Sequence, residues 1–232
     1  MALEGERMLA EALEAGIAPD VVFHAADAAE EVLRGAQQRG ATLVPTTTRE
    51  LARLSDMPSA RGLVALAGIP EPRLPSLDGG AFALLLDGVQ DPANVGAILR
   101  SAEAFGACGA ALTAGCASPY GARALRASAG SALRIPVAQG LTAAEALAWA
   151  RRSGATLAGA VAHGGEPPEH RTGDPLVLAI GSEGRGLSAE VNDALELRIT
   201  IPLAAPVESL NAAVAAGILL YSLSPNTSAE KR

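Results

Sequence analysis

The segment FALLLDGVQDPANVGAILRSAEAF, residues 82–105, indicates the fold more clearly than any other part of the sequence. Its first five residues are apolar without interruption, which is typical of a strand buried inside a sheet. Asp87, Gly88 and Pro92 follow and predict a turn. Apolar side chains at helical spacing then predict a helix over residues 94–105. A strand, a loop and a helix in this order form the unit of a parallel α/β sheet.

The same alternation continues along the chain. The predicted strands cover residues 82–86, 109–113, 135–138, 156–161, 176–180 and 197–201. The predicted helices cover residues 94–105, 120–129, 143–152, 189–194 and 209–223, the last with Ser209 as its N-cap. Apolar strands that alternate with amphipathic helices predict a parallel sheet with helices on both faces. Such sheets bind ligands beyond the carboxyl ends of their strands.

A smaller α/β unit precedes this sheet. Its predicted helices cover residues 7–15, 27–38 with Asp27 as a cap, and 48–54, and its predicted strands cover 20–25, 42–46 and 61–68. Residues 69–80, IPEPRLPSLDGG, hold three prolines and end in two glycines, which is typical of a linker. We therefore expect an N-terminal domain over residues 1–70, a linker over 71–80, a larger domain over 81–225 and a flexible tail over 226–232.

Composition and charge limit the classes of function. The chain has 232 residues, of which 49% are hydrophobic and 19% charged, so it is expected to fold as a globular protein. Its net charge of −7 gives no overall attraction for nucleic acid. A nucleic-acid partner would therefore have to be held by a local basic patch.

The two cysteines, Cys108 and Cys116, have no neighbouring His or Cys. Their spacing fits neither a zinc site nor a redox CxxC motif, so we expect two buried reduced thiols and no metal. The first residues are acidic and amphipathic, unlike a signal peptide, and the apolar runs are shorter than the ~18 residues that span a membrane. These features predict a cytoplasmic protein without a membrane segment.

Three loops that follow predicted strands carry unusual residues. The first has the pattern N-x-G-x-x-x-R at Asn94, Gly96 and Arg100, the second is GSEGRGL at residues 181–187, and the third is I-P-x(6)-S-L-N at residues 201–211. Taken singly, each has an ordinary structural explanation: a surface arginine, a glycine turn, or a helix cap. The glycine loop lacks the G-x-G-x-x-G spacing and follows a late strand, so it does not predict a dinucleotide site.

In this order, the three motifs resemble those of the SpoU (TrmH-type) family of RNA ribose 2′-O-methyltransferases, part of the SPOUT superfamily. The resemblance covers about residues 80–223. The segment LEGERMLAEALEAG near the start resembles the opening of the small, ribosomal-protein-like substrate-binding domain that some members carry. The resemblance implies a trefoil knot in the larger domain and a homodimer with residues 212–223 in the interface. A helix buried within the monomer is the alternative for that last segment.

The resemblance also implies the site. Gly181, Ile201 and Leu210 would contact S-adenosylmethionine, largely through main-chain groups and apolar surface. The neighbouring cofactor-site candidates are Ile180, Gly184 and Pro202.

The catalytic candidates implied by the resemblance are Arg100, Asn94, Glu183, Ser209 and Asn211. Asn94 would orient Arg100 or the ribose, Glu183 would pair with Arg100 or hold the shape of the site, and Ser209 and Asn211 would place a phosphate or shape their loop. Two roles stay open for Arg100: a general base, or a cation that binds phosphate and stabilises the developing alkoxide. Deprotonating an arginine at pH 7 costs about 7 kcal/mol, which favours the cation.

Four further residues are candidates for RNA binding: Arg123, Arg126, Arg134 and Ser128. They lie in or beside the segment ALRASAGSALRIPV, residues 124–137, which resembles a family segment near the substrate. Ordinary solvated arginines are the alternative. Residues 1–75 hold seven Arg against eleven Asp and Glu, so charge does not explain how the first domain would hold RNA. Glu208 adds a negative charge to the third motif, where Ala205 and Pro206 stand in place of a common Gly.

Three hypotheses for function follow. The favoured one is methylation of ribosomal RNA. Methylation of transfer RNA is the second, and the additional N-terminal domain argues against it because family members that act on transfer RNA often lack one. The third is an RNA-binding protein without catalysis, against which the intact motif residues Asn94, Arg100, Glu183 and Asn211 argue.

Overall fold

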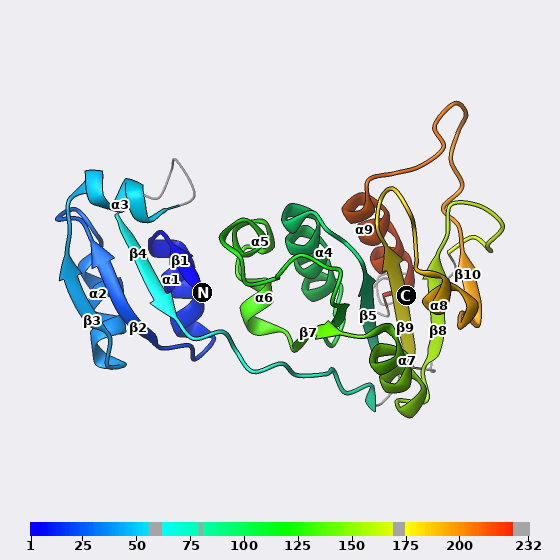
Figure 1. The fold of residues 1–232 in the computed structure, drawn as a ribbon, viewed down its shortest axis with the longest axis horizontal. Helices are drawn as coiled ribbons and strands as arrows, with labels where there is room; N and C mark the ends of the chain where they lie inside the picture. The colour runs from blue at the N-terminus through cyan, green and yellow to red at the C-terminus, as the bar shows by residue number, and fades with distance from the viewer. Residues whose placement is uncertain (56–61, 79–80, 169–174, 225–232) are drawn as a thin grey trace, which may run out of the picture.

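The computed structural model describes residues 1–55, 62–78, 81–168 and 175–224, which form two α/β domains (Figure 1). A four-stranded sheet lies in the first domain and a six-stranded sheet in the second. The predicted fold class, a larger parallel α/β domain behind a smaller α/β domain, is confirmed. The predicted tail, residues 226–232, lies outside the described residues, and the trefoil knot stays a prediction.

The first domain is a mixed sheet flanked by three helices. Its strands are β1 (Ala2–Glu4), β2 (Pro19–His24), β3 (Thr42–Pro45) and β4 (Leu63–Ala67), in the order β1-β4-β2-β3. Its helices are α1 (Glu6–Glu14), α2 (Glu30–Gln38) and α3 (Thr48–Leu54). The sequence did not predict β1, because three residues carry no periodicity and only pairing with β4 defines the strand. Asp27 does not cap α2, whose N-cap is Ala29.

The larger sheet is parallel throughout. Its strands are β5 (Phe82–Asp87), β6 (Ala110–Thr113), β7 (Val137–Leu141), β8 (Thr156–Ala160), β9 (Leu176–Gly181) and β10 (Leu197–Ile199). Their order is β10-β8-β9-β5-β6-β7. Strands β6 and β7 therefore lie on one side of β5, and the later strands β8, β9 and β10 lie on the other side. Strands β5 and β9 end side by side, with Asp87 opposite Gly181. This reversal of strand order is where open parallel sheets bind ligands.

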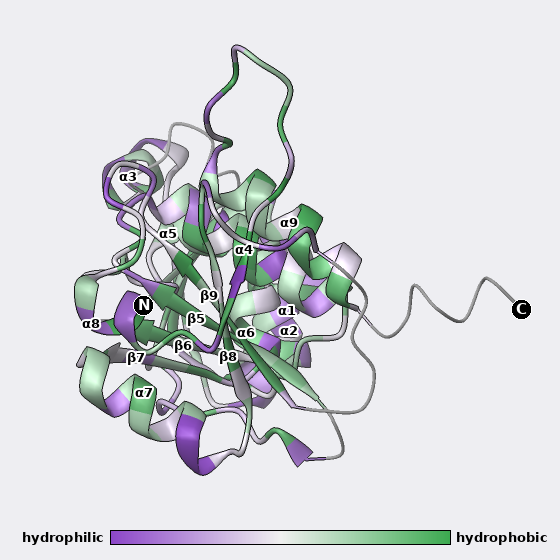
Figure 2. Ribbon diagram, turned by 90° about the vertical axis from the view of Figure 1, so that its right-hand side faces the viewer, coloured by the Kyte–Doolittle hydropathy of each residue, from purple (hydrophilic) through white to green (hydrophobic). Residues whose placement is uncertain are grey.

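Both faces of this sheet are covered, as the uninterrupted apolar strands predict. Leu84 and Leu86 of β5 belong to one buried core with Ile98 of α4 (Pro92–Ala104). Leu85, which points the opposite way, belongs to a second core with Trp149 of α7 (Ala143–Arg152). The remaining helices are α5 (Ala122–Ser128), α6 (Ser131–Arg134), α8 (Ala189–Asp193) and α9 (Ala212–Leu223). Figure 2 shows that the central strands are hydrophobic along most of their length.

The starts of one strand and one helix differ from the predicted starts. Helix α6 ends at Arg134 with Ile135 as its C-cap, and β7 begins at Val137, two residues later than predicted. Helix α9 begins at Ala212 and not at Ser209, because Asn211 is its N-cap: the Asn211 side chain accepts hydrogen bonds from the backbone of Ala213 and Val214 at 2.9 and 3.2 Å. The predicted cap at Ser209 is wrong.

The glycine in the first motif is required by packing. A Cβ atom on Gly96 would lie 2.2 Å from the carbonyl oxygen of Ala124 and 2.9 Å from the backbone nitrogen of Ser128. These atoms belong to the backbone of α5, which cannot turn aside as a side chain can. Helices α4 and α5 therefore cross as closely as they do because residue 96 has no side chain.

The segment predicted as a linker is packed against the larger domain. Pro75 and Leu77 are buried, and the indole nitrogen of Trp149 donates to the carbonyl oxygen of Pro75 at 3.0 Å. The backbone nitrogen of Arg73 donates to Val137 of β7 at 3.1 Å. Residues 79–80 lie outside the described residues. In Figure 1 the segment runs along the edge of the larger domain from β4 toward β5.

Both cysteines are free, as predicted, but each is only half-buried. Burial raises the pKa of the Cys108 and Cys116 thiols above the ordinary value, so neither is a reactive thiolate near neutral pH. Among the described helices, none has the length and apolarity to cross a membrane.

Candidate active site

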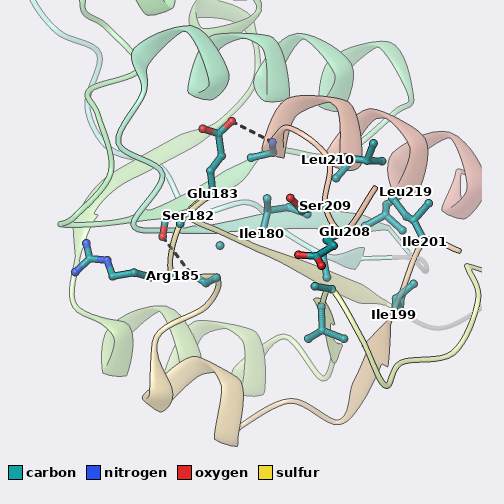
Figure 3. A pocket seen from close by; sticks show the side chains of 18 of the residues that line it. Ile180, Ser182, Glu183, Arg185, Ile199, Ile201, Glu208, Ser209, Leu210 and Leu219 are labelled. Carbon is teal, nitrogen blue, oxygen red and sulfur yellow. Dashed lines mark hydrogen bonds between the residues drawn. The ribbon is translucent and has the colours of Figure 1, made fainter. Parts of the chain in front are cut away.

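A pocket of about 370 Å³ opens at the carboxyl ends of β8, β9 and β10. Its walls are mainly aliphatic (Figure 3). The apolar side chains around it include Ile180, Ile199, Ile201, Leu210 and Leu219. Volume and lining both suit a small organic molecule, since such sites are mostly apolar with a few polar groups.

Most of the predicted cofactor residues meet in this pocket. Ile180, Gly181, Gly184, Ile201 and Leu210 all line it, although the second and third motifs are separated in sequence by a helix and a strand. The predicted neighbour Pro202 is exposed and is not part of the lining. Sequence reasoning missed Ala160 and Val161, which line the pocket at the end of β8. Their position at the end of a predicted parallel strand could have indicated them, because ligands bind beyond the carboxyl ends of such strands.

The loop after β9 folds tightly against its own strand. The backbones of Ser182 and Gly186 exchange two hydrogen bonds of 3.0 and 2.8 Å, and Gly186 has a φ of +67°. A Cβ atom on Gly181 would lie 2.2 Å from the carbonyl carbon of Gly186. The glycine at position 181 is therefore needed to form the loop, whatever the pocket binds.

One side-chain network joins all three motifs. The Glu183 carboxylate accepts hydrogen bonds from the side-chain amides of Asn94 at 2.8 Å and Asn211 at 2.5 Å. The Asn211 amide also donates to the Asn94 side-chain oxygen at 3.1 Å. The backbone nitrogen of Ala212 donates to the same oxygen of Glu183 at 3.4 Å (Figure 3). Glu183 is 89 positions from Asn94 and 28 from Asn211 in the sequence, and Asn94 is 117 positions from Asn211. The fold brings the three side chains into direct contact.

The contacts of this network bear on the roles predicted for its members. The Glu183 carboxylate links three segments of the chain and lies at the N-terminus of α9, where an anion is favoured. In the described part of the chain it does not pair with Arg100. Asn94 is buried and is directed to Glu183 and Asn211. Ser209 lines the pocket, beside Leu210.

Arg100 lies apart from this network. It follows Asn94 by six residues on α4, which is about 9 Å along the helix and on a different face. Its side chain is exposed, and no hydrogen bond or ion pair links it to another described residue. The guanidinium is therefore available to a ligand that approaches from outside.

Three of the four predicted RNA-binding residues are exposed, and two of them, Arg123 and Arg126, lie on α5. The Arg123 guanidinium lies 3.8 Å from the Asp91 carboxylate and is 65% exposed. Asp91 caps α4, so Arg123 is held next to the helix that carries Asn94. Arg126 is also exposed and lines a second pocket between the two domains.

Arg134 is ion-paired within the protein, and Ser128 is buried. The Arg134 guanidinium makes two hydrogen bonds of 2.7 Å to Glu103 of α4 and also pairs with Glu11 of α1 in the first domain. These hydrogen bonds raise the pKa of Arg134 and lower the pKa of Glu103. Ser128 is fully buried, and its hydroxyl donates to the carbonyl of Leu125 at 2.9 Å. Arg134 therefore joins the two domains, and its contact with RNA stays a prediction. The burial of Ser128 corrects the RNA-binding role predicted for that residue.

Asp87, the last residue of β5, is a site residue that sequence reasoning missed. Its buried carboxylate accepts a hydrogen bond from the backbone of Ser188 at 2.7 Å and one from the hydroxyl of Thr113 at 3.2 Å. It thereby fixes the loop after β9 to the ends of two neighbouring strands. An acid directly after an apolar strand was the only signal, since its partners lie 101 and 26 residues away. In the described part of the chain, no three His, Cys, Asp or Glu side chains form a metal site.

The larger domain matches a known family. The model of the SpoU rRNA Methylase family covers residues 81–221, which include the pocket and every member of the Glu183 network. The chain belongs to the SpoU family. The likeness stated from the three motifs is thus confirmed over residues 81–221.

Curated relatives carry a related description. A protein described as an uncharacterized tRNA/rRNA methyltransferase of Mycobacterium ulcerans is 41% identical over 145 residues, which are 62% of this chain and 46% of that protein. One with the same description from Mycobacterium avium is 34% identical over 234 residues, which are 95% of this chain and 75% of that protein. The match therefore spans about half of the first relative and three quarters of the second.

Solved SpoU-type structures resemble this chain to different extents. A Sinorhizobium meliloti rRNA methyltransferase with bound AdoMet is 26% identical with a TM-score of 0.83, covering 95% of this chain and 85% of that one. An RNA 2′-O ribose methyltransferase is 29% identical with a TM-score of 0.79, and the match covers 96% of this chain and 86% of that one. A protein studied for 2-OH methylation of C/U34 on tRNA is 28% identical with a TM-score of 0.54, covering 65% of this chain and 98% of its own.

Proposed function

We propose that this chain transfers the methyl group of S-adenosylmethionine to a ribose 2′-hydroxyl of ribosomal RNA. The observation that carries the proposal is the Asn94–Glu183–Asn211 network, which joins three separate motifs at the rim of an apolar pocket on the ligand-binding edge of a parallel sheet. Membership of the SpoU family and the activities named for its structural neighbours support the same reaction.

The pocket fits the cofactor by size and by the chemistry of its lining. When bound, S-adenosylmethionine supplies an electrophilic methyl group on a positively charged sulfur. Ile201 and Leu210 offer apolar surface for an adenine, and the backbone around Gly181 offers hydrogen-bonding groups without a side chain in the way. Asp87 and the Glu183 network hold the two loops that carry these groups.

The residues of this chain contribute mainly positioning. A hydroxyl that attacks a methyl group must approach in line with the bond that breaks, and holding the reactants in that geometry lowers the barrier. The exposed, uncommitted guanidinium of Arg100 binds a phosphate of the RNA and stabilises the alkoxide that develops on the ribose. Arg123 and Arg126 add positive charge on the neighbouring helix α5.

Ribosomal RNA is favoured as the substrate by the two-domain structure. The neighbour named as an rRNA methyltransferase matches 95% of this chain, so it resembles both domains. The neighbour named for tRNA matches 65% of this chain but 98% of its own. The first domain is thus matched by the neighbour named for rRNA but lies largely outside the match to the neighbour named for tRNA.

A direct test measures transfer of tritiated methyl groups from S-adenosylmethionine to separate pools of unmethylated ribosomal RNA and transfer RNA. Incorporation into ribosomal RNA, with the label recovered on ribose, is the expected result. Greater incorporation into transfer RNA would overturn the substrate assignment. Cofactor binding without transfer to either pool would favour an RNA-binding protein without catalysis.

Replacing Arg100 by Lys tests the role proposed for the guanidinium. Lysine keeps the charge but loses the planar set of donors, so we expect kcat/KM for RNA to fall about tenfold. The dissociation constant for S-adenosylmethionine should not change, because Arg100 does not line the pocket. Arg152→Lys on α7 is the matched control. Near-normal activity of R100K would show that no bidentate contact is needed.

We also propose that the chain forms a homodimer through α9. Val214, Ile218 and Tyr221 recur at helical spacing on this helix and are 52%, 38% and 58% exposed, so they form one apolar stripe. Ile218→Glu would place a charge in the centre of the stripe. The variant should sediment as a monomer at concentrations where the wild type is a dimer, whereas Ile69→Glu, at another exposed isoleucine, should not. A monomeric wild type would refute this assembly.

A further inference from the structure

Among the described residues, three ionisable side chains line the apolar pocket: Glu183, Arg185 and Glu208. Glu183 is committed to the amides of Asn94 and Asn211. Figure 3 shows the Arg185 side chain extending away from the pocket, whereas the Glu208 carboxylate points into it, beside Ile180 and Ser209. No hydrogen bond or ion pair links Glu208 to another described residue. Glu208 is thus the uncommitted charge that faces the ligand.

A carboxylate beside aliphatic side chains favours a positively charged ligand group over a negatively charged one. A phosphate would be repelled, and an attractive contact requires a positive charge or a hydrogen-bond donor. S-adenosylmethionine has two positive groups, the sulfonium and the α-ammonium. The α-ammonium lies next to the cofactor's own carboxylate, which already neutralises it and would repel a second carboxylate. The sulfonium has no anion beside it.

We propose that Glu208 recognises the sulfonium of S-adenosylmethionine and thereby distinguishes the cofactor from its demethylated product. S-adenosylhomocysteine has a neutral thioether at this position, so it gains nothing from the carboxylate. Glu208 thus favours exchange of the spent product for fresh cofactor. This inference rests on the proposed methyl-transfer function and adds to it a residue that sets cofactor specificity.

The experiment compares three ligands by isothermal titration calorimetry: S-adenosylmethionine, S-adenosylhomocysteine, and sinefungin, which carries an ammonium group in place of the sulfonium. They are titrated into the wild type and into Glu208→Gln, which keeps the size of the side chain and removes its charge. We expect E208Q to bind the two ligands with a cation at this position about fivefold more weakly, as for a partly exposed ion pair. Affinity for S-adenosylhomocysteine should change less than twofold.

Glu190→Gln is the control, because Glu190 is an exposed glutamate on α8 that does not line the pocket. It should bind all three ligands like the wild type. Equal weakening of all three ligands by E208Q would mean that Glu208 contacts a group they share, and would overturn the inference while leaving the methyltransferase proposal in place. Unchanged affinities would overturn it in the same way. A wild type that binds none of the three would overturn the proposed function and this inference together.

Discussion

Replacing Gly96 by Ala should lower the free energy of unfolding by about 3 kcal/mol, which is large for a single added methyl group. The new Cβ would lie 2.2 Å from the carbonyl oxygen of Ala124, so α4 and α5 must move apart. Both helices pack in the core that covers one face of the larger sheet, and their separation would loosen it. Urea unfolding followed by circular dichroism measures the loss.

Gly68→Ala is the matched control for this experiment. A Cβ at Gly68 meets no atom within 4 Å and its φ is not in the left-handed region, so the unfolding free energy should change by less than about 0.5 kcal/mol. If G96A were as stable as G68A, the close helix crossing would not depend on the missing side chain.

Replacing Glu183 by Ala should reduce the rate of methyl transfer about 100-fold or more. The substitution removes the shared acceptor of three donors: the amides of Asn94 and Asn211 and the backbone nitrogen of Ala212. The buried Asn94 amide would lose a partner, and the three motifs would no longer be held together. Single-turnover transfer to RNA measures the effect on the chemical step.

Glu183→Gln separates charge from hydrogen bonding in the same network. Its amide oxygen can still accept, so the fold of the loop should persist, but the charge near the N-terminus of α9 is gone. We expect its rate to fall between that of the wild type and E183A, with Glu190→Ala as the surface control. Full activity of E183A would contradict the idea that the network shapes the site.

The sequence predicted the parts of the fold that depend on local patterns. Uninterrupted apolar strands and amphipathic helices were sufficient for the larger sheet, because burial on two faces leaves a clear signature in each element. The strand β1 was missed because it exists through pairing with β4, 60 or more residues away. Ser209 and Asn211 both suit the start of a helix, and only the path of the loop makes Asn211 the cap.

The site was predictable mainly because three motifs occur in a recognisable order. That order indicated which residues lie together in the site, but not which hydrogen bonds join them. Contacts between Asn94, Glu183 and Asn211 depend on three segments converging at one sheet edge, which no local pattern encodes. The role predicted for Ser128 was wrong because its burial cannot be read from the sequence, and the pairing of Arg134 with Glu11 and Glu103 depends on segments that only the fold brings together. Asp87 was missed for a related reason, since only the fold reveals its partners.

The position of Asn211 has a consequence for how the protein is made. Asn94 and Glu183 leave the ribosome well before the residue that completes their network and caps the last helix. Any nascent chain that stops short of Asn211 lacks one wall of the pocket as well as the network. A chain that ends before residue 211 therefore leaves Asn94 and Glu183 without their third partner, and the pocket is enclosed only after Ala212, Ala215 and Leu219 have been added.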